Sequence, residues 1–236
     1  MAIEYSRKRV IKDIQILSKN KDDLEKRGIY YYIDENNLSI MWLLINPEHK
    51  HDTTTGLVSP YIGGFFMFKI EFPDEYPMTA PKVEFYPKQN AYRLHPNYYE
   101  SGKVCLSMIN TWGNNDWCPS MSILSLTTVL EERFNERPLS FEPGFENESV
   151  SKLDYYNKCV KYGVFDVCMC AILEGKYHEF NKFNNIIQSK KRKCLELAEL
   201  ALMSIGPTTT SFIQPCYTHK ININYVNIVA RLRRVM

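Results

Sequence analysis

The sequence predicts an α+β fold in which a helix precedes a four-stranded antiparallel meander, and an ordered loop, a crossing helix and C-terminal helices follow. Apolar residues recur at helical spacing near the N-terminus, four short aliphatic and aromatic runs come next, and helical patterns fill the second half. Hydrophobic residues make up 44% and charged residues 24% of the 236 residues, which suits a globular protein that buries a core.

The first half of the chain supplies the helix and the strands. Val10, Ile14 and Leu17 predict a helix with Ser6 as its N-cap, and Gly28 ends the charged stretch after it. Short loops between the strands favour an antiparallel meander. The strands are expected at residues 29–33, 38–45, 65–72 and 82–86.

A long irregular stretch, roughly residues 87–119, follows the strands. Loops of this length in a compact domain are usually functional or disordered, and the apolar content of this one argues against disorder. We therefore expect an ordered loop, anchored by Trp112 and Trp117, in which a site is built.

The second half of the chain reads as helical. A helix is expected near residues 121–134, beginning at Pro119-Ser120. Two more are expected at about 150–173, ended by Gly175, and at 178–203, stopped by Gly206. The remaining tail is ambiguous, since the alternation of Ile221, Ile223 and Tyr225 hints at a strand, whereas residues 226–232 could form a helix.

Net charge and cysteine content limit the binding partners and the cellular compartments that we expect for this protein. The formal net charge of +2 gives no case for nucleic acid or membrane binding, and the basic run 190–193 is interpreted as a solvated helix face. Seven scattered cysteines favour a reducing compartment. Residues 1–10 have no apolar signal core, and no apolar run approaches the roughly 20 residues that span a bilayer. We expect a soluble cytoplasmic protein, and nothing in the sequence excludes entry into the nucleus. If the source is a virus, we expect it in the host cytoplasm.

The most informative segment begins at His95-Pro96-Asn97 and continues to Cys105, eight positions after Asn97. A cysteine among apolar neighbours is usually a small buried hydrophobe, but this one lies in the ordered loop. Downstream, a Trp-x-Pro motif precedes a helix. Upstream motifs are Tyr61-Ile62-Gly63-Gly64-Phe65-Phe66 and the prolines and aromatics from Phe72 to Val83.

In this order, the motifs resemble the ubiquitin-conjugating enzyme family over roughly residues 5–175. The segments 90–95, 102–107, 110–112, 142–146 and 156–160 are similar to its larger Z-type branch. The resemblance implies a ubiquitin-conjugating fold, with a catalytic core at residues 1–148, a C-terminal helical extension at 149–205 and a tail of unknown role at 206–236.

The resemblance also implies a mechanism. Cys105 would accept ubiquitin or a ubiquitin-like protein from an activating enzyme as a thioester and pass it to a lysine of a substrate protein or to a ubiquitin ligase. Asn97 matches the family's catalytic asparagine, which either donates to the developing oxyanion or braces the loop, although it could simply cap a turn. Glu142 aligns with an acidic position that orients the attacking amine, or it forms a helix-entry turn. No metal or bound nucleotide is implied.

The same resemblance implies a partner surface. Basic positions on the first helix would meet the activating enzyme, two loops would meet the ligase, and the outer face of the crossing helix would meet the donor ubiquitin. In that order, the residues are Arg7 and Lys8; Met78, Pro119 and Ser120; and Ser125, Thr128 and Glu132.

Three other interpretations compete with a conjugating enzyme. A catalytically silent ubiquitin-binding variant would typically lack the cysteine. A Cys–His hydrolase would need a histidine oriented against Cys105, for which His95, His178 and His219 are candidates, although a packed loop histidine is expected at position 95. A nucleic-acid module lacks basic–aromatic interleaving. Among the other cysteines, we expect Cys118 to be packed, and Cys168 and Cys170 to be core residues rather than zinc ligands.

Overall fold

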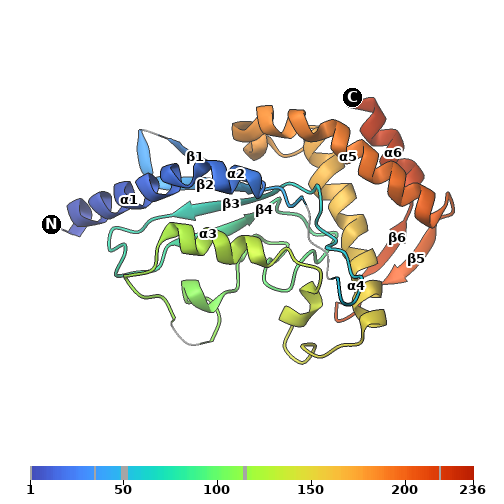
Figure 1. Ribbon diagram of the computed structural model, residues 1–236, viewed down its shortest axis with the longest axis horizontal. Helices are drawn as coiled ribbons and strands as arrows, with labels where there is room; N and C mark the ends of the chain where they lie inside the picture. The colour runs from blue at the N-terminus through green and yellow to red at the C-terminus, as the bar shows by residue number, and fades with distance from the viewer. Residues whose placement is uncertain (1, 35, 49–52, 114–115, 218) are drawn as a thin grey trace. The chain divides into compact units, whose positions relative to one another are not determined.

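Four antiparallel strands form a meander in the computed structural model, which confirms the α+β prediction (Figure 1). Strand β3 lies between β2 and β4, and its Phe66, Met67, Phe68 and Ile70 are fully buried. Because β3 presents apolar residues on both faces, it forms the centre of the core. The strands are β1 (Ile29–Asp34), β2 (Asn37–Ile45), β3 (Phe66–Glu71) and β4 (Lys82–Tyr86).

The structure describes residues 2–34, 36–48, 53–113, 116–217 and 219–236. Contacts divide the chain into two compact units built from discontinuous segments. Unit 1 comprises Met1–Ile45, Phe66–Lys88 and Asn97–Arg133, whereas unit 2 comprises Asn46–Phe65, Gln89–Pro96 and Phe134–Met236. The division into a core, a helical extension and a tail stays a prediction. In the described ranges, no helix has the length and apolarity needed to cross a membrane.

Helix α1 (Ala2–Lys19) buries Val10 and Leu17 as predicted, and α2 (Lys21–Lys26) follows it. Gly28 then takes a positive φ of 77°, which glycine adopts without a Cβ clash. The prediction of Ser6 as an N-cap was wrong, because the helix begins earlier. The buried Ser6 hydroxyl instead donates to the carbonyl of Pro73 at 3.2 Å, so its partner is tertiary.

Helix α3 (Ile123–Glu132) contacts α1 within unit 1. Its predicted start at Pro119-Ser120 was early, because Ser122 is the N-cap and its hydroxyl accepts from the amide of Ser125 at 3.1 Å. Ile123, Leu126 and Leu130 are fully buried, which confirms the predicted apolar face.

The two helices predicted after residue 149 are present in unit 2. Helix α4 (Val150–Gly163) is capped by Ser149 and continues as the π-helix η3 (Val164–Ala171). Gly175, at a φ of 75°, follows this helical run. The 3₁₀ helix η4 (His178–Phe183) leads into α5 (Asn184–Ile205), so the predicted third helix starts with a tighter turn.

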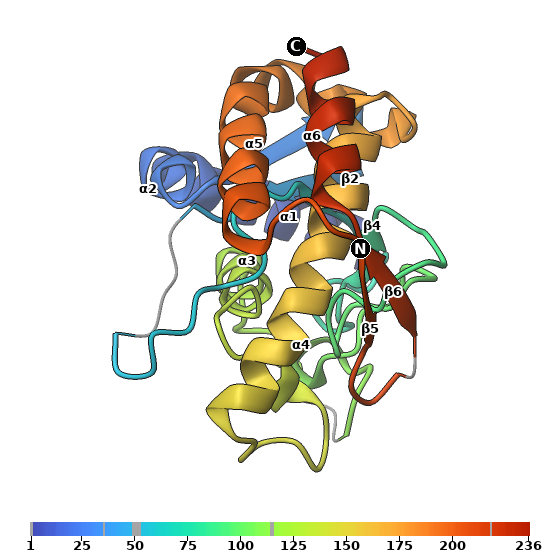
Figure 2. The same ribbon diagram turned by 90° about the vertical axis from the view of Figure 1, so that its right-hand side faces the viewer.

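The tail forms regular structure. Strands β5 (Thr210–Ile213) and β6 (Lys220–Ile223) pair antiparallel, and α6 (Tyr225–Arg234) lies beside α5 in Figure 2. The predicted terminal helix is confirmed. The alternation of apolar residues grouped Tyr225 with the strand, but Tyr225 is the first residue of the helix. Asn224 caps this helix, because its side chain accepts from the amide of Asn227 at 3.0 Å.

Candidate functional site

A short antiparallel hairpin positions Cys105. A bridge joins Tyr98 to Val104, and the same register places Asn97 opposite Cys105. The amide of Cys105 donates to the carbonyl of Asn97 at 2.9 Å, and Nδ2 of Asn97 donates to the carbonyl of Cys105 at 3.0 Å. The eight-position spacing therefore corresponds to one cross-strand pair.

Gly102 allows this hairpin to turn and to approach strand β4. Its φ is 93°, a region that side chains with a Cβ rarely adopt. The amide of Phe85 donates to the carbonyl of Gly102 at 2.8 Å, and a Cβ on Gly102 would lie 3.0 Å from the Phe85 carbonyl oxygen. Together with the bridge between Glu84 and Lys103, this contact holds the hairpin on the edge of the sheet.

Thr111 organises the chain just after the cysteine. Cys105 is 5% exposed, and its thiol lies 3.5 Å from the carbonyl oxygen of Thr111. The Thr111 hydroxyl oxygen accepts from the amide of Leu106 at 2.9 Å, so it closes the turn around η1 (Ser107–Ile109). This role was not predicted, because a threonine in a loop gives no signal of the backbone group that it will bind.

The two loop tryptophans behave differently. Trp117 is buried, its indole donates to the carbonyl of Pro77 at 2.7 Å, and its amide donates to the side chain of Asn110 at 3.0 Å. It anchors the loop, as predicted. The same prediction for Trp112 was wrong, because that side chain is 54% exposed. A tryptophan in the sequence does not by itself show whether its indole N–H will lie next to a buried carbonyl.

Glu142 and His95 belong to unit 2. Glu142 follows the 3₁₀ helix η2 (Pro138–Phe141), and its carboxylate accepts a short hydrogen bond from the hydroxyl of Tyr217. His95 is fully buried beside the rings of Tyr61, Phe134 and Phe141, as expected of a packed loop histidine. The catalytic role of Glu142 stays a prediction.

The residues of the predicted partner surface are accessible to solvent, as a docking surface requires. Met78 is 64% exposed, and Thr128, whose hydroxyl donates to the carbonyl of Leu124, is only partly exposed. Their roles stay predictions. The exposed members of the set are Arg7, Lys8, Met78, Pro119, Ser120, Ser125 and Glu132.

Arg9 connects α1 to the loop that precedes α3, a role that was not predicted. Its guanidinium donates to the carbonyls of Pro119 and Met121 and pairs with Asp13 at 2.9 Å. Asp13 is 1% exposed and also accepts from the hydroxyl of Tyr76 at 2.6 Å. Burial, and then the Asp13 carboxylate, raise the pKa of Tyr76 well above its usual value, so Tyr76 stays a donor.

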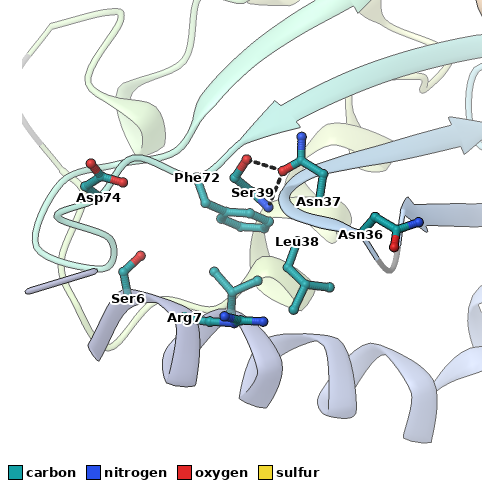
Figure 3. A pocket seen from close by; sticks show the side chains of 9 residues that line it. Ser6, Arg7, Asn36, Asn37, Leu38, Ser39, Phe72 and Asp74 are labelled. Atoms are coloured by element: carbon teal, nitrogen blue, oxygen red, sulfur yellow. Dashed lines mark hydrogen bonds between the residues drawn. The ribbon is translucent and has the colours of Figure 1, made fainter. Parts of the chain in front are cut away.

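Unit 1 contains two notable cavities. One of about 240 Å³ lies between α1 and the turn that joins β1 to β2, with Arg7 and Asp74 among its lining residues (Figure 3). The second, of about 480 Å³, is lined by Lys82 of β4 and by Val104 and Thr111, which flank the position of Cys105 in the hairpin and the following turn. The second cavity is therefore the one beside the cysteine-bearing loop.

The remaining cysteines divide into buried and exposed groups. Cys168 and Cys170 are fully buried, as predicted, and burial raises the pKa of the Cys170 thiol to about 12. The prediction that Cys118 is packed was wrong, because it is exposed and its sulfur lies 2.8 Å from the Ser120 hydroxyl. That hydroxyl lowers the pKa of Cys118. Among the described residues, no set of three His, Cys, Asp or Glu side chains is arranged to hold a metal ion.

The meander, the crossing helix and the cysteine paired with an asparagine in a loop beside the sheet define a protein of the ubiquitin-conjugating class. The family model for ubiquitin-conjugating enzymes matches residues 9–159. The chain belongs to the ubiquitin-conjugating enzyme family.

Similar proteins include enzymes of the Z type. Ubiquitin-conjugating enzyme E2 Z of Xenopus tropicalis is 39% identical over 120 residues, which are 50% of this chain and 38% of that protein. The Homo sapiens protein of the same name is 38% identical over 120 residues, covering 50% of this chain and 34% of that protein. The alignments therefore span less than two fifths of the length of these relatives. The similarity to them confirms the predicted resemblance to the Z branch.

Solved structures include a ubiquitin-conjugating enzyme E2 from Plasmodium falciparum, which is 22% identical to this chain with a TM-score of 0.43. That match covers 55% of this chain and 83% of the other.

Proposed function

We propose that the protein accepts ubiquitin or a ubiquitin-like protein from an activating enzyme as a thioester on Cys105. It then transfers the modifier to a lysine amine of a substrate protein or to a ubiquitin ligase, in the cytoplasm. The single observation that supports this most is the cross-strand pairing of Asn97 with Cys105, which fixes the backbone on both sides of the thiol.

Transfer exchanges a thioester for an amide. The lysine ammonium first loses one proton to solvent, and its nitrogen attacks the thioester carbonyl. The C–N bond forms as the C–S bond breaks, the nitrogen gives up its second proton, and Cys105 leaves as a thiol. A strong general base beside the thioester would also activate water, so a carrier benefits from having none there.

Asn97 is proposed to act through the loop that bears the cysteine. Its Nδ2 donates to the Cys105 carbonyl, which supports the bracing interpretation over that of a free oxyanion donor. Glu142 is proposed to accept a hydrogen bond from the incoming amine and so to orient it for attack. The partner surface defined above is proposed to bind the activating enzyme, the ligase and the donor ubiquitin.

The test is a charging assay with ubiquitin, ATP and a panel of activating enzymes, resolved on non-reducing and reducing gels. We expect a reducible adduct that is lost in Cys105→Ser and retained in Cys118→Ser, the matched control at an exposed thiol. Asn97→Ala should still charge but should discharge onto lysine up to roughly 100-fold more slowly, because the loop that positions the thioester loses its brace.

A folded sample that forms no adduct with any activating enzyme or modifier would contradict the proposal. It would favour the silent ubiquitin-binding module, which a direct ubiquitin-binding measurement would then detect.

A further inference from the structure

The connection between β5 and β6 holds one tyrosine in a defined position. The amide of Gln214 donates to the carbonyl of His219 at 2.8 Å and closes the base of this connection. Cys216 takes a φ of 72°, which is uncommon for a residue with a side chain. Such outliers persist where the surrounding structure requires them, and the next residue is Tyr217.

Tyr217 reaches back to Glu142, 75 positions earlier in the chain. Its hydroxyl donates to Oε2 of that carboxylate. The guanidinium of Arg93 lies 5.3 Å from the centre of the Tyr217 ring, and the ring of Tyr156 lies 6.5 Å away. Burial first, and then the hydrogen bond to Glu142, raise the pKa of Tyr217 far above its usual value. Tyr217 therefore remains protonated and donates throughout the neutral range.

The same hairpin also contacts the segment that leads into Asn97. Gln214 is 1% exposed, and its Nε2 donates to the carbonyl of Arg93 at 2.7 Å. The Arg93 guanidinium donates to the carbonyl of Pro96 at 2.9 Å, and Pro96 immediately precedes Asn97 in the chain. The tail thus touches two segments that carry, or lead directly to, predicted transfer residues.

We propose that Tyr217 is a positioning residue for amine transfer, which holds the Glu142 carboxylate where it orients the attacking lysine. This inference rests on the proposed function and on the role proposed there for Glu142. It gives the tail, which the sequence left without a role, a direct part in the second half of the reaction.

The hydrogen bond from Tyr217 holds the Glu142 carboxylate in place without preventing it from accepting a second hydrogen bond. A carboxylate offers about four lone-pair sites on two oxygens, and the Tyr217 hydroxyl occupies Oε2. Oε1 can accept from an incoming amine while Oε2 is held. A hydrogen bond to a charged acceptor is among the stronger ones, so it limits the rotation of a partly exposed side chain.

The experiment compares two nucleophiles on the same charged protein. After Cys105 is loaded with ubiquitin and the activating enzyme is quenched, the adduct is chased with free lysine or with a small thiol. The thiol attacks without needing an oriented amine. For Tyr217→Phe we expect unchanged charging, an unchanged thiol chase and a lysine chase slowed roughly fivefold to tenfold.

Tyr155→Phe is the matched control. The Tyr155 hydroxyl accepts from the amide of Ile213 at 3.3 Å, so this variant also removes one hydroxyl that anchors the same hairpin. Its lysine chase should match that of the unmodified protein. In a Glu142→Gln background, which should itself slow the lysine chase, Tyr217→Phe should add nothing, because the two side chains would act as one unit.

Several outcomes would overturn the inference. These are an unchanged or faster lysine chase in Tyr217→Phe, an equal slowing of both chases, and an additive loss with Glu142→Gln. Each leaves the carrier function standing if the unmodified protein charges on Cys105. Failure of the unmodified protein to charge would instead contradict the proposed function.

Discussion

Replacing Arg231 by methionine should lower the free energy of unfolding of this protein by about 2 kcal/mol. The Arg231 side chain is 14% exposed, and its Nε and Nη2 donate to the two oxygens of Glu174 at 2.6 and 2.9 Å. Its Nη1 pairs with Asp166 of η3. Methionine retains much of the apolar volume but removes the charge-assisted bonds, so Asp166 loses this guanidinium while Glu174 keeps Lys176, at 2.8 Å, as a cationic partner.

The magnitude follows from Glu174. The hydrogen bond from Arg231 is the main cause that lowers the pKa of Glu174 from 4.5 to about 2. At about 1.4 kcal/mol per pH unit, that difference corresponds to ~3.5 kcal/mol at most, part of which comes from Lys176. Solvent reaches this pair and screens it, so we expect about 2 kcal/mol. In a chain of this size the thermal midpoint should fall by roughly 4–8 °C.

The pH dependence has a definite sign. Because the folded pKa of Glu174 lies below its unfolded value, the stabilisation is fully present above about pH 4.5. It is lost progressively as the pH falls towards 2. The difference between the unmodified protein and Arg231→Met should therefore stay constant from pH 8 to pH 5 and shrink by pH 3.5.

Urea unfolding followed by far-ultraviolet circular dichroism at pH 7.5, 5 and 3.5 measures these differences. The matched control is Arg233→Met on the same helix, whose side chain is 65% exposed and pairs with Glu199. The control should change the free energy of unfolding by less than about 0.5 kcal/mol. Equal losses in the two variants, or a loss from Arg231→Met as large at pH 3.5 as at pH 7.5, would refute the reasoning.

Three further predictions concern positions away from this network. Gly63→Ala should cost at least about 2 kcal/mol in chemical denaturation, because φ is 79° and a Cβ would lie 2.5 Å from a leucine side chain of α5. Tyr76→Phe should cost about 1–3 kcal/mol in the same assay, because the buried carboxylate of Asp13 loses a donor. Maleimide labelling of Cys118 near pH 7.5 should slow in Ser120→Ala, because the Ser120 hydroxyl lowers the pKa of that thiol.

Two of these predictions have an internal comparison. Gly56→Ala is the control for Gly63→Ala, since φ is 72° at Gly56 but no atom lies within 4 Å of its built Cβ. A loss as large at Gly56 as at Gly63 would contradict the steric argument. Cys216, the other exposed cysteine, should label at the same rate with and without Ser120→Ala. A slower Cys216 would indicate a general change in the protein rather than a local one.

Local patterns were sufficient for the strands, and they marked Asn97 and Cys105 as a motif without predicting that the two residues pair across a hairpin. Runs of β-branched, aliphatic and aromatic residues, three of them ended by a nearby proline, predicted all four strands of the meander to within two residues. The spacing between Asn97 and Cys105 carried structural information because residues close in sequence can pair only through a short hairpin. Gly102 was also visible in the sequence, and its role as the turn residue follows from its missing side chain.

The same sequence patterns did not show which group each polar side chain would bind. Ser6 looked like a helix cap but binds the Pro73 carbonyl, 67 positions away. Trp112 and Trp117 looked alike, but only Trp117 lies where a buried carbonyl can accept from its indole. The start of α3 was predicted too early, at Pro119-Ser120, where the carbonyls of Pro119 and Met121 accept from Arg9 of α1.

The sequence by itself determined the fold class and the family, and it predicted the thiol, because periodicity, turn residues and short-range spacing are properties of neighbouring residues. Tertiary structure alone decided that Thr111 closes the turn after Cys105, and that the tail binds back through Tyr217 and Gln214. A hydrogen bond between Tyr217 and Glu142 joins residues 75 positions apart. Nothing local in either segment encodes that contact, which exists only because folding brings the two segments of unit 2 together.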